Sequence, residues 1–117
     1  MATLTFYHNP RCSKSREALA LLEARGTEFT LRRYLDEPLS LIELQSLAAR
    51  LVRPVESLVR TNEDEWKALA LSAPGDEQRL QAIAQYPRLL QRPLLDNGDR
   101  AIIGRPPEAI LTLLDEA

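Results

Sequence analysis

Cysteine, histidine, methionine and tryptophan each occur only once in this chain of 117 residues. A lone cysteine cannot form an internal disulfide, which excludes a disulfide-stabilised scaffold and favours the reducing environment of the cytoplasm. Zinc sites need at least three protein ligands, whereas this chain has one cysteine, one histidine and no clustered carboxylates to complete a set. We therefore expect no metal site.

Long apolar runs and a strong net charge are also absent. No segment approaches the roughly 20 apolar residues that span a membrane, and the first five residues do not resemble a secretory signal. The formal charge of -2 argues against a nucleic-acid interface spread over the surface. We expect a single domain, residues 1–117, that binds neither membranes nor nucleic acids, and we expect it to be a cytoplasmic monomer.

Hydrophobic periodicity predicts a β-α-β unit in the first third of the chain. Residues 3–7 and 27–34 alternate polar and apolar side chains, as half-buried strands do. Between them, residues 13–25 follow a helical spacing, and Gly26 provides a typical helix end. Strands joined by a helix in this way are normally parallel, with a right-handed crossover.

The middle of the chain, from about residue 40 to residue 88, has a helical character. Ser40 and Glu43 have the spacing of a capping box ahead of an apolar helical face. Asn62 and Glu65 repeat that spacing ahead of a shorter apolar segment. Because prolines interrupt the pattern, we expect several short helices here.

The last part of the chain returns to strands and ends in a helix. Asn97-Gly98 is a strong turn signal between two apolar segments and predicts a hairpin over residues 94–103. Pro106 and Pro107 then open a final helix. The full order is β-α-β, a helical insertion, then β-β-α. This order predicts an α/β thioredoxin-like fold with a mixed sheet.

Cys12 stands between the first predicted strand and the first predicted helix. A thiol at a helix start faces unpaired backbone amides and the positive end of the helix dipole, and both favour the thiolate. Its neighbours include four basic residues, which are His8, Arg11, Lys14 and Arg16. A buried structural cysteine is the alternative. The polar, basic surroundings favour a reactive cysteine instead.

Residue 15 is a serine, so the chain reads Cys12-Ser13-Lys14-Ser15 where dithiol redox proteins have Cys-x-x-Cys. No second thiol of this chain can resolve a disulfide or covalent adduct formed on Cys12. An external thiol must therefore do so, and glutathione or a partner redox protein is the expected source. We expect no bound cofactor, with glutathione acting as a co-substrate.

Three arginines stand beside structure-breaking positions far from Cys12 in sequence: Arg60, Arg92 and Arg105. In a thioredoxin-like fold the proline that enters the third strand, here Pro93, is characteristically cis and lies beside the active thiol. That position would bring Arg92 to the site as well. Each of these arginines, taken alone, could instead be an ordinary solvated surface residue. Only for Arg92 does the fold argument favour a place in the site.

Four segments make up one pattern: Tyr-His-Asn-Pro-Arg-Cys-Ser-Lys-Ser-Arg at residues 7–16, Arg60, Gln-Arg-Pro at 91–93 and Gly-Arg-Pro-Pro-Glu at 104–108. Over nearly the whole chain, this pattern resembles the glutaredoxin-dependent arsenate reductase family, and most of all its short branch with the Cys-Ser-Lys-Ser motif. The resemblance implies a thioredoxin-like fold with an inserted helical region.

The resemblance also implies a chemistry. Cys12 would attack arsenate and form a covalent adduct, and His8 would help to keep the thiolate. The oxyanion would be held by three arginines and by the amides after Cys12, namely by Arg60, Arg92, Arg105, Ser13, Lys14 and Ser15. Glutathione would attack the adduct, and glutaredoxin would discharge the mixed species as arsenite leaves. The implied substrate is arsenate, and the implied partners are glutathione and glutaredoxin.

Two other functions remain open from the sequence. A general glutathione-dependent thiol oxidoreductase would use Cys12 on disulfides without needing the three arginines. A non-enzymatic regulator that binds RNA polymerase, as some members of the same family do, typically carries a Cys-x-x-Cys switch. Ser15 removes that switch here.

Overall fold

The computed structural model describes residues 4–114. Four strands form one sheet in the order β2-β1-β3-β4, and they are β1 (Thr5–His8), β2 (Thr30–Arg33), β3 (Leu94–Asp96) and β4 (Ala101–Ile103). β1 and β2 run parallel, whereas β3 is antiparallel to both β1 and β4. The prediction of an α/β thioredoxin-like fold with a mixed sheet is confirmed.

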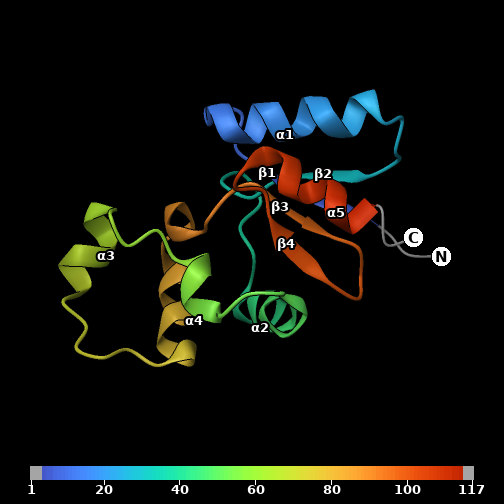
Figure 1. The fold of residues 1–117 in the computed structure, drawn as a ribbon. Coiled ribbons are helices and arrows are strands. Elements are labelled where there is room, and N and C mark those ends of the chain that lie inside the picture. The colour runs from blue at the N-terminus through green and yellow to red at the C-terminus, as the bar shows by residue number, and fades with distance from the viewer. Residues whose placement is uncertain (1–3, 115–117) are drawn as a thin grey trace.

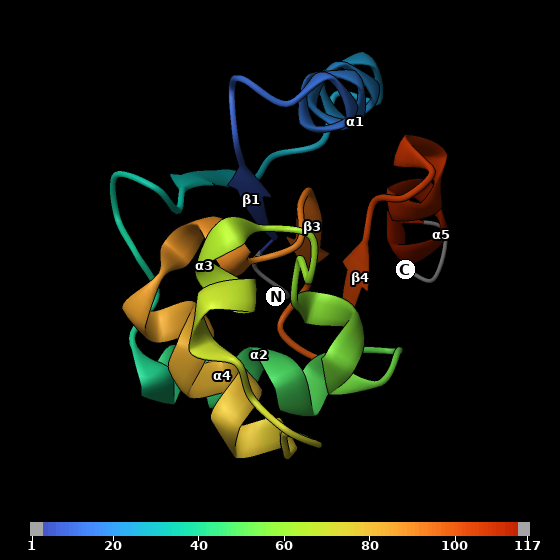
Figure 2. The same ribbon diagram turned by 90° about the vertical axis from the view of Figure 1, so that its left-hand side faces the viewer.

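Two groups of helices cover the two faces of this sheet (Figure 1). α1 (Ser13–Ala24) and α5 (Ile110–Leu114) lie together on one face. The inserted segment lies on the other face, as the turned view in Figure 2 also shows. It contains α2 (Leu41–Arg50), α3 (Asp64–Leu69) and α4 (Asp76–Gln85), with 3-10 turns at Val55–Leu58 and Pro87–Leu89. A third such turn, Pro107–Ala109, leads into α5.

Alternation along the strands divides the core into two clusters of buried side chains. On β1, Phe6 packs with α1 and α5, whereas Tyr7 packs with the insertion. On β3, Leu95 likewise packs with α1 and α5, and Leu94 packs with the insertion. This is the period of two expected of a sheet that is covered on both faces. Within residues 4–114, no helix is long and apolar enough to cross a membrane.

Helix α2 begins with the predicted capping box. The Glu43 amide donates to Ser40 Oγ at 3.1 Å, and the Ser40 amide donates to the Glu43 carboxylate at 3.0 Å. The second predicted box, Asn62 with Glu65, is wrong. Helix α3 begins after Glu63, whose side chain makes no capping hydrogen bond. The physical reason is a turn over residues 60–63, in which the Glu63 amide donates to the Arg60 carbonyl at 3.2 Å, so that the first helical hydrogen bonds go to the Glu63 carbonyl.

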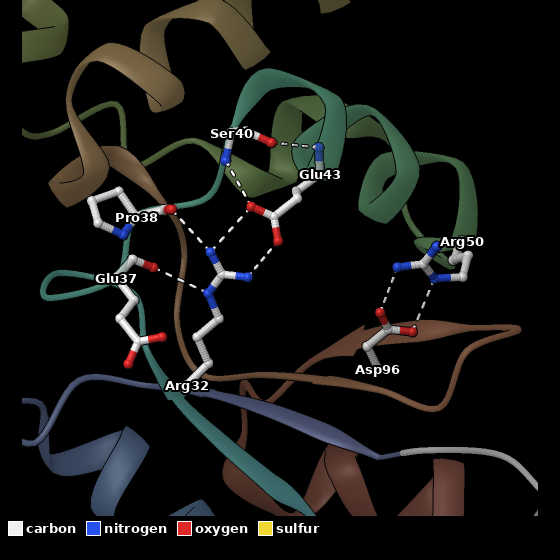
Figure 3. Close-up of polar contacts among 7 residues, drawn as sticks. All are labelled: Arg32, Glu37, Pro38, Ser40, Glu43, Arg50 and Asp96. Atoms are coloured by element: carbon white, nitrogen blue, oxygen red, sulfur yellow. Dashed lines mark hydrogen bonds and ion pairs between the residues drawn. The ribbon is translucent and has the colours of Figure 1, made fainter.

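Two arginines fasten the insertion to the sheet (Figure 3). Arg32 of β2 binds the Glu43 carboxylate and donates to two backbone carbonyls of the connection between β2 and α2. Arg50 of α2 makes a two-pronged ion pair with Asp96 of β3, at 3.0 and 2.6 Å. Asp96 is 5% exposed, so its carboxylate is largely shielded from water, whereas the Arg50 side chain is 26% exposed. Planar arginine–carboxylate pairs of this kind fix orientation as well as distance.

Candidate active site

Three connections of the sheet bring Cys12, Arg92 and Arg105 to one edge. Cys12 follows the end of β1, Arg92 precedes β3, and Arg105 follows β4. The end of β1 lies beside the start of β3, which pairs with the end of β4, so all three connections emerge together. The Arg105 Nη2 atom lies 4.0 Å from Cys12 Sγ. Residues far apart in sequence therefore meet at the thiol.

The loop before α1 closes as a tight turn that holds Cys12 at the helix start. The Cys12 amide donates to the Asn9 carbonyl at 3.0 Å, and the Arg11 amide donates to the Asn9 side-chain oxygen at 3.0 Å. The guanidinium of Arg16 reaches back to the Pro10 carbonyl at 2.9 Å. Cys12 consequently occupies the N-cap position of α1, where free amides point toward it.

The two Arg-Pro segments pack directly against each other. The Arg92–Pro93 peptide bond is cis, as expected for a thioredoxin-like fold. The Arg105–Pro106 bond is also cis, which nothing in the sequence had indicated. The Gly104 amide donates to the Pro93 carbonyl at 2.8 Å. A Cβ atom at position 104 would lie 2.7 Å from Pro93 Cγ. Only glycine permits this close approach.

Arg60 is held beside the other two arginines by a short antiparallel contact between residues 58–60 and 89–91. Two backbone hydrogen bonds of 2.8 and 2.7 Å make this contact. Burial, together with the positive charges of Arg92 and Arg105, lowers the pKa of Arg60. The three guanidinium groups are thus close enough to interact electrostatically. Arg105 is in addition anchored by a hydrogen bond of 2.9 Å from its Nε to the Arg92 carbonyl.

The pKa of the Cys12 thiol is lowered from its ordinary value. Burial raises this pKa, but the Ser15 amide, the Arg92 guanidinium and the Lys14 amide together outweigh burial. The Lys14 side chain instead lies 3.8 Å from Glu17. The amides at the helix start therefore act as predicted. The main cation is Arg92, from a distant part of the chain, and not one of the basic neighbours in sequence.

His8 reaches the site through Ser15. Its Nδ1 atom lies 2.7 Å from Ser15 Oγ, which also accepts the Asn9 amide at 3.0 Å. Burial, followed by the charges of Arg33 and Arg16, lowers the pKa of His8 from 6.5. The lowered pKa favours the neutral imidazole near pH 7, a charge state that the sequence left open. Its hydrogen bond orients Ser15, whose amide favours the thiolate.

A polar cleft of about 440 Å³ opens beside Arg92, and we call it the arginine cleft; Cys12 and Arg105 are not among the residues that line it. Arg60 and Arg92 line it, together with residues that the sequence did not single out for binding: Asn9, Arg11, Tyr34, Leu35, Glu63 and Arg88. Glu63 pairs with Arg60 at 2.5 Å and with Arg88 at 3.4 Å. The spacing of three residues between Arg60 and Glu63 was the available sequence signal for the first pair.

This arrangement suits the capture of a tetrahedral anion. A thiolate at a helix start faces planar guanidinium groups that can bind oxygen atoms in pairs. Within residues 4–114, the buried Arg92 Nε atom has no hydrogen-bond partner in the protein. Fixed donors aimed at developing negative charge are the usual means of stabilising an anionic transition state. The geometry thus fits nucleophilic attack by Cys12 on a bound oxyanion.

This chain is similar to known proteins over nearly its full length. The model of the ArsC family matches residues 7–113. The chain is 43% identical over 115 residues to an arsenate reductase of Haemophilus influenzae, covering 96% of this chain and 99% of that protein. An arsenate reductase of Neisseria meningitidis serogroup A is 40% identical over 117 residues, covering 97% and 100%. The solved structure of an arsenate reductase from Vibrio cholerae is 38% identical in sequence and superposes with a TM-score of 0.87. The superposition includes 95% of this chain and 97% of the Vibrio cholerae chain.

Proposed function

Because this chain belongs to the ArsC family, we propose that it reduces arsenate to arsenite with glutathione and glutaredoxin. The observation that carries the proposal is a helix-start thiol whose pKa is lowered by Ser15 and Lys14 amides and by Arg92, against the opposing effect of burial. Arg105 lies 4.0 Å from the same sulfur. A general thiol oxidoreductase needs the low pKa but does not need this set of arginines.

In the proposed reaction, the Cys12 thiolate attacks the arsenic atom of bound arsenate and forms a sulfur–arsenic bond, while one arsenate hydroxyl group takes up a proton from solvent and leaves as water. Arg60, Arg92 and Arg105 hold the remaining oxygens, aided by the amides of the first turn of α1. These amides belong to Ser13, Lys14 and Ser15. The guanidinium groups bind most strongly as negative charge develops on the oxygens, which is the requirement for rate acceleration.

An external thiol completes the cycle because this chain has no second cysteine. The thiolate of glutathione attacks the adduct on Cys12, and glutaredoxin discharges the mixed species as arsenite leaves. Over the whole cycle two thiols become one disulfide, arsenic gains two electrons, and Cys12 returns to the thiolate. His8 serves by holding Ser15, and therefore the first turn of α1, in place.

The proposal is tested by assaying arsenate reduction with glutathione and glutaredoxin. We expect Cys12→Ser to abolish turnover and Arg92→Ala or Arg105→Ala to lower kcat by about 10²-fold, as loss of one oxyanion donor typically does. Arg53→Ala, at an exposed position outside the cleft, is the matched control. Arsenate reduction that survives Cys12→Ser would sink the proposal. Wild-type reduction of small disulfides but not of arsenate, unaffected by Arg60→Ala, would favour the general oxidoreductase instead.

A further inference from the structure

The arginine cleft is larger than an oxyanion requires. Its volume of about 440 Å³ lies within the range of roughly 300–1,000 Å³ that is typical of sites for small organic ligands. Arsenate is one tetrahedral group and fills only a fraction of that space. The cleft therefore has room for a second, larger molecule beside Arg92.

The lining of the arginine cleft indicates the charge of that molecule. Four arginines and one glutamate contribute to it: Arg11, Arg60, Arg88, Arg92 and Glu63. The lining is thus strongly cationic, which favours a ligand with more than one carboxylate. The single acid, Glu63, is already paired with Arg60 and Arg88 and leaves the positive charge of the other arginines uncompensated. Its side chain is 16% exposed and is held by arginines on two sides.

The cleft also has a direction. Arg92 marks its inner end, because its guanidinium lies close enough to Cys12 to favour the thiolate. Arg88 marks the outer end, where its side chain is 66% exposed and lies 3.6 Å from Glu65 of α3. Arg11, exposed and next to Cys12 in sequence, lines the cleft from the loop between β1 and α1. A ligand in the cleft therefore has one part near the thiol and charged ends near Arg11 and Arg88.

We propose that the arginine cleft is the binding site for glutathione, with its carboxylates at Arg88 and Arg11 and its thiol directed past Arg92 to Cys12. This assignment rests on the proposed use of glutathione by this enzyme. Glutathione is a flexible tripeptide with two carboxylates, one ammonium group and a central thiol. Its carboxylates match the arginines of the cleft, and its thiol matches the neighbouring Cys12 in kind.

The test uses thiol–disulfide exchange and needs no arsenate. The Cys12 thiolate attacks one sulfur of oxidised glutathione, which forms a mixed disulfide on Cys12 and releases one glutathione thiolate. Mass spectrometry follows this reaction, and bis(2-hydroxyethyl) disulfide serves as an uncharged comparison. We expect the wild type to prefer oxidised glutathione. The ratio of the two rate constants falls roughly fivefold in Arg88→Gln, the upper end for an exposed ion pair.

Arg53→Gln is the matched control, because it removes the same charge from an exposed position outside the cleft. We expect it to leave the ratio unchanged, whereas Arg11→Gln lowers the ratio as Arg88→Gln does. A wild type without preference, or a ratio unaffected by Arg88→Gln, would overturn the assignment. A preference that depends on Arg88 in a protein that fails to reduce arsenate would contradict the proposed reaction and support the site.

Discussion

The reactivity of Cys12 is a balance between burial and three favourable contacts. Burial disfavours the thiolate, whereas the Ser15 amide, Arg92 and the Lys14 amide favour it and prevail. The thiolate is the nucleophilic form, so the position of this balance sets the fraction of reactive enzyme at neutral pH. Arg92 is the one member of the set whose charge can be removed without changing the backbone of α1.

We predict that Arg92→Gln raises the pKa of Cys12 toward the ordinary thiol value of about 8.5. In the wild type, these contacts lower the pKa of Cys12 from its ordinary value. The pH dependence of alkylation by iodoacetamide, an uncharged reagent, measures both, and Arg53→Gln is the control for a general loss of positive charge. A wild-type value of about 8.5 or higher would contradict the balance described here.

Ser15 is the second residue whose replacement is informative. It is fully buried, and its Oγ atom satisfies both the His8 ring and the Asn9 amide. We predict that Ser15→Ala lowers the free energy of unfolding by about 1–3 kcal/mol, because it leaves buried polar groups without partners. Urea unfolding measures the change. Ser57→Ala, which removes an exposed hydroxyl bonded to the Pro54 carbonyl, should cost less than about 0.5 kcal/mol. Equal losses in the two variants would refute this role.

The role of a single residue could be predicted from the sequence where the residues that determine it are close by in the chain. The helix-start position of Cys12 follows from a strand pattern that breaks before a helical one, and both signals lie within a few residues. The choice of Arg92 as the main cation needed the fold, because a strand pairing brings it to the thiol. The neutrality of His8 could not be predicted, since it depends on burial and on Arg33 of the neighbouring strand.

At the scale of elements, the insertion depends on its polar attachments to the sheet. Arg32 binds the Glu43 carboxylate, and this hydrogen bond, followed by the one from the Ser40 amide, lowers the pKa of Glu43 to about 2. The folded-state value thus lies below the ordinary 4.5. The associated stability is present above pH 4.5 and is lost progressively as the pH falls toward 2.

We predict that Glu43→Gln lowers the free energy of unfolding at pH 7 by about 1 kcal/mol, a small value because the Glu43 side chain is 45% exposed. Glutamine still accepts the Ser40 amide, so the capping box remains and only the charge is lost. The difference between wild type and variant should shrink as the pH falls from 4.5 to 3. Urea titrations across this range measure it. A difference that is independent of pH would contradict the ionic origin.

Helix and strand boundaries that depend on neighbouring residues were predicted well. Features that depend on residues far away in the sequence were not. The start of α2 follows from Ser40 and Glu43, which bond to each other. The start of α3 was misplaced because the pairing of residues 58–60 with 89–91 fixes Arg60 and the turn that follows it, which puts the helix N-cap at Glu63. Likewise, Gly104 in the sequence does not show that its missing Cβ makes room for Pro93.

For the whole molecule, the formal charge of -2 conceals a strongly cationic site. Arginines from three separate connections gather around one thiol, and carboxylates such as Glu43 and Asp96 are engaged elsewhere by Arg32 and Arg50. A local cationic cleft attracts anions, and added salt weakens that attraction. The fold class was predictable because the order of strands and helices restricts the possible topologies. The arrangement of the arginines was not, since it depends on packing.

A complete site within one chain is consistent with a monomer, which remains a prediction. Cys12 and all three arginines come from the same chain, so no second copy is needed to assemble them. We expect light scattering to give the mass of a single chain, 13.2 kDa. A mass twice as large that persists on dilution would contradict this expectation.

The most direct test of the central claim is a crystal structure of the protein soaked with arsenate. We predict that the anion lies over Cys12, with its oxygens within about 2.7–3.0 Å of the guanidinium groups of Arg92 and Arg105. Density continuous with Cys12 Sγ would mark the covalent adduct. An anion bound away from Cys12, or none at saturating concentration, would contradict the account.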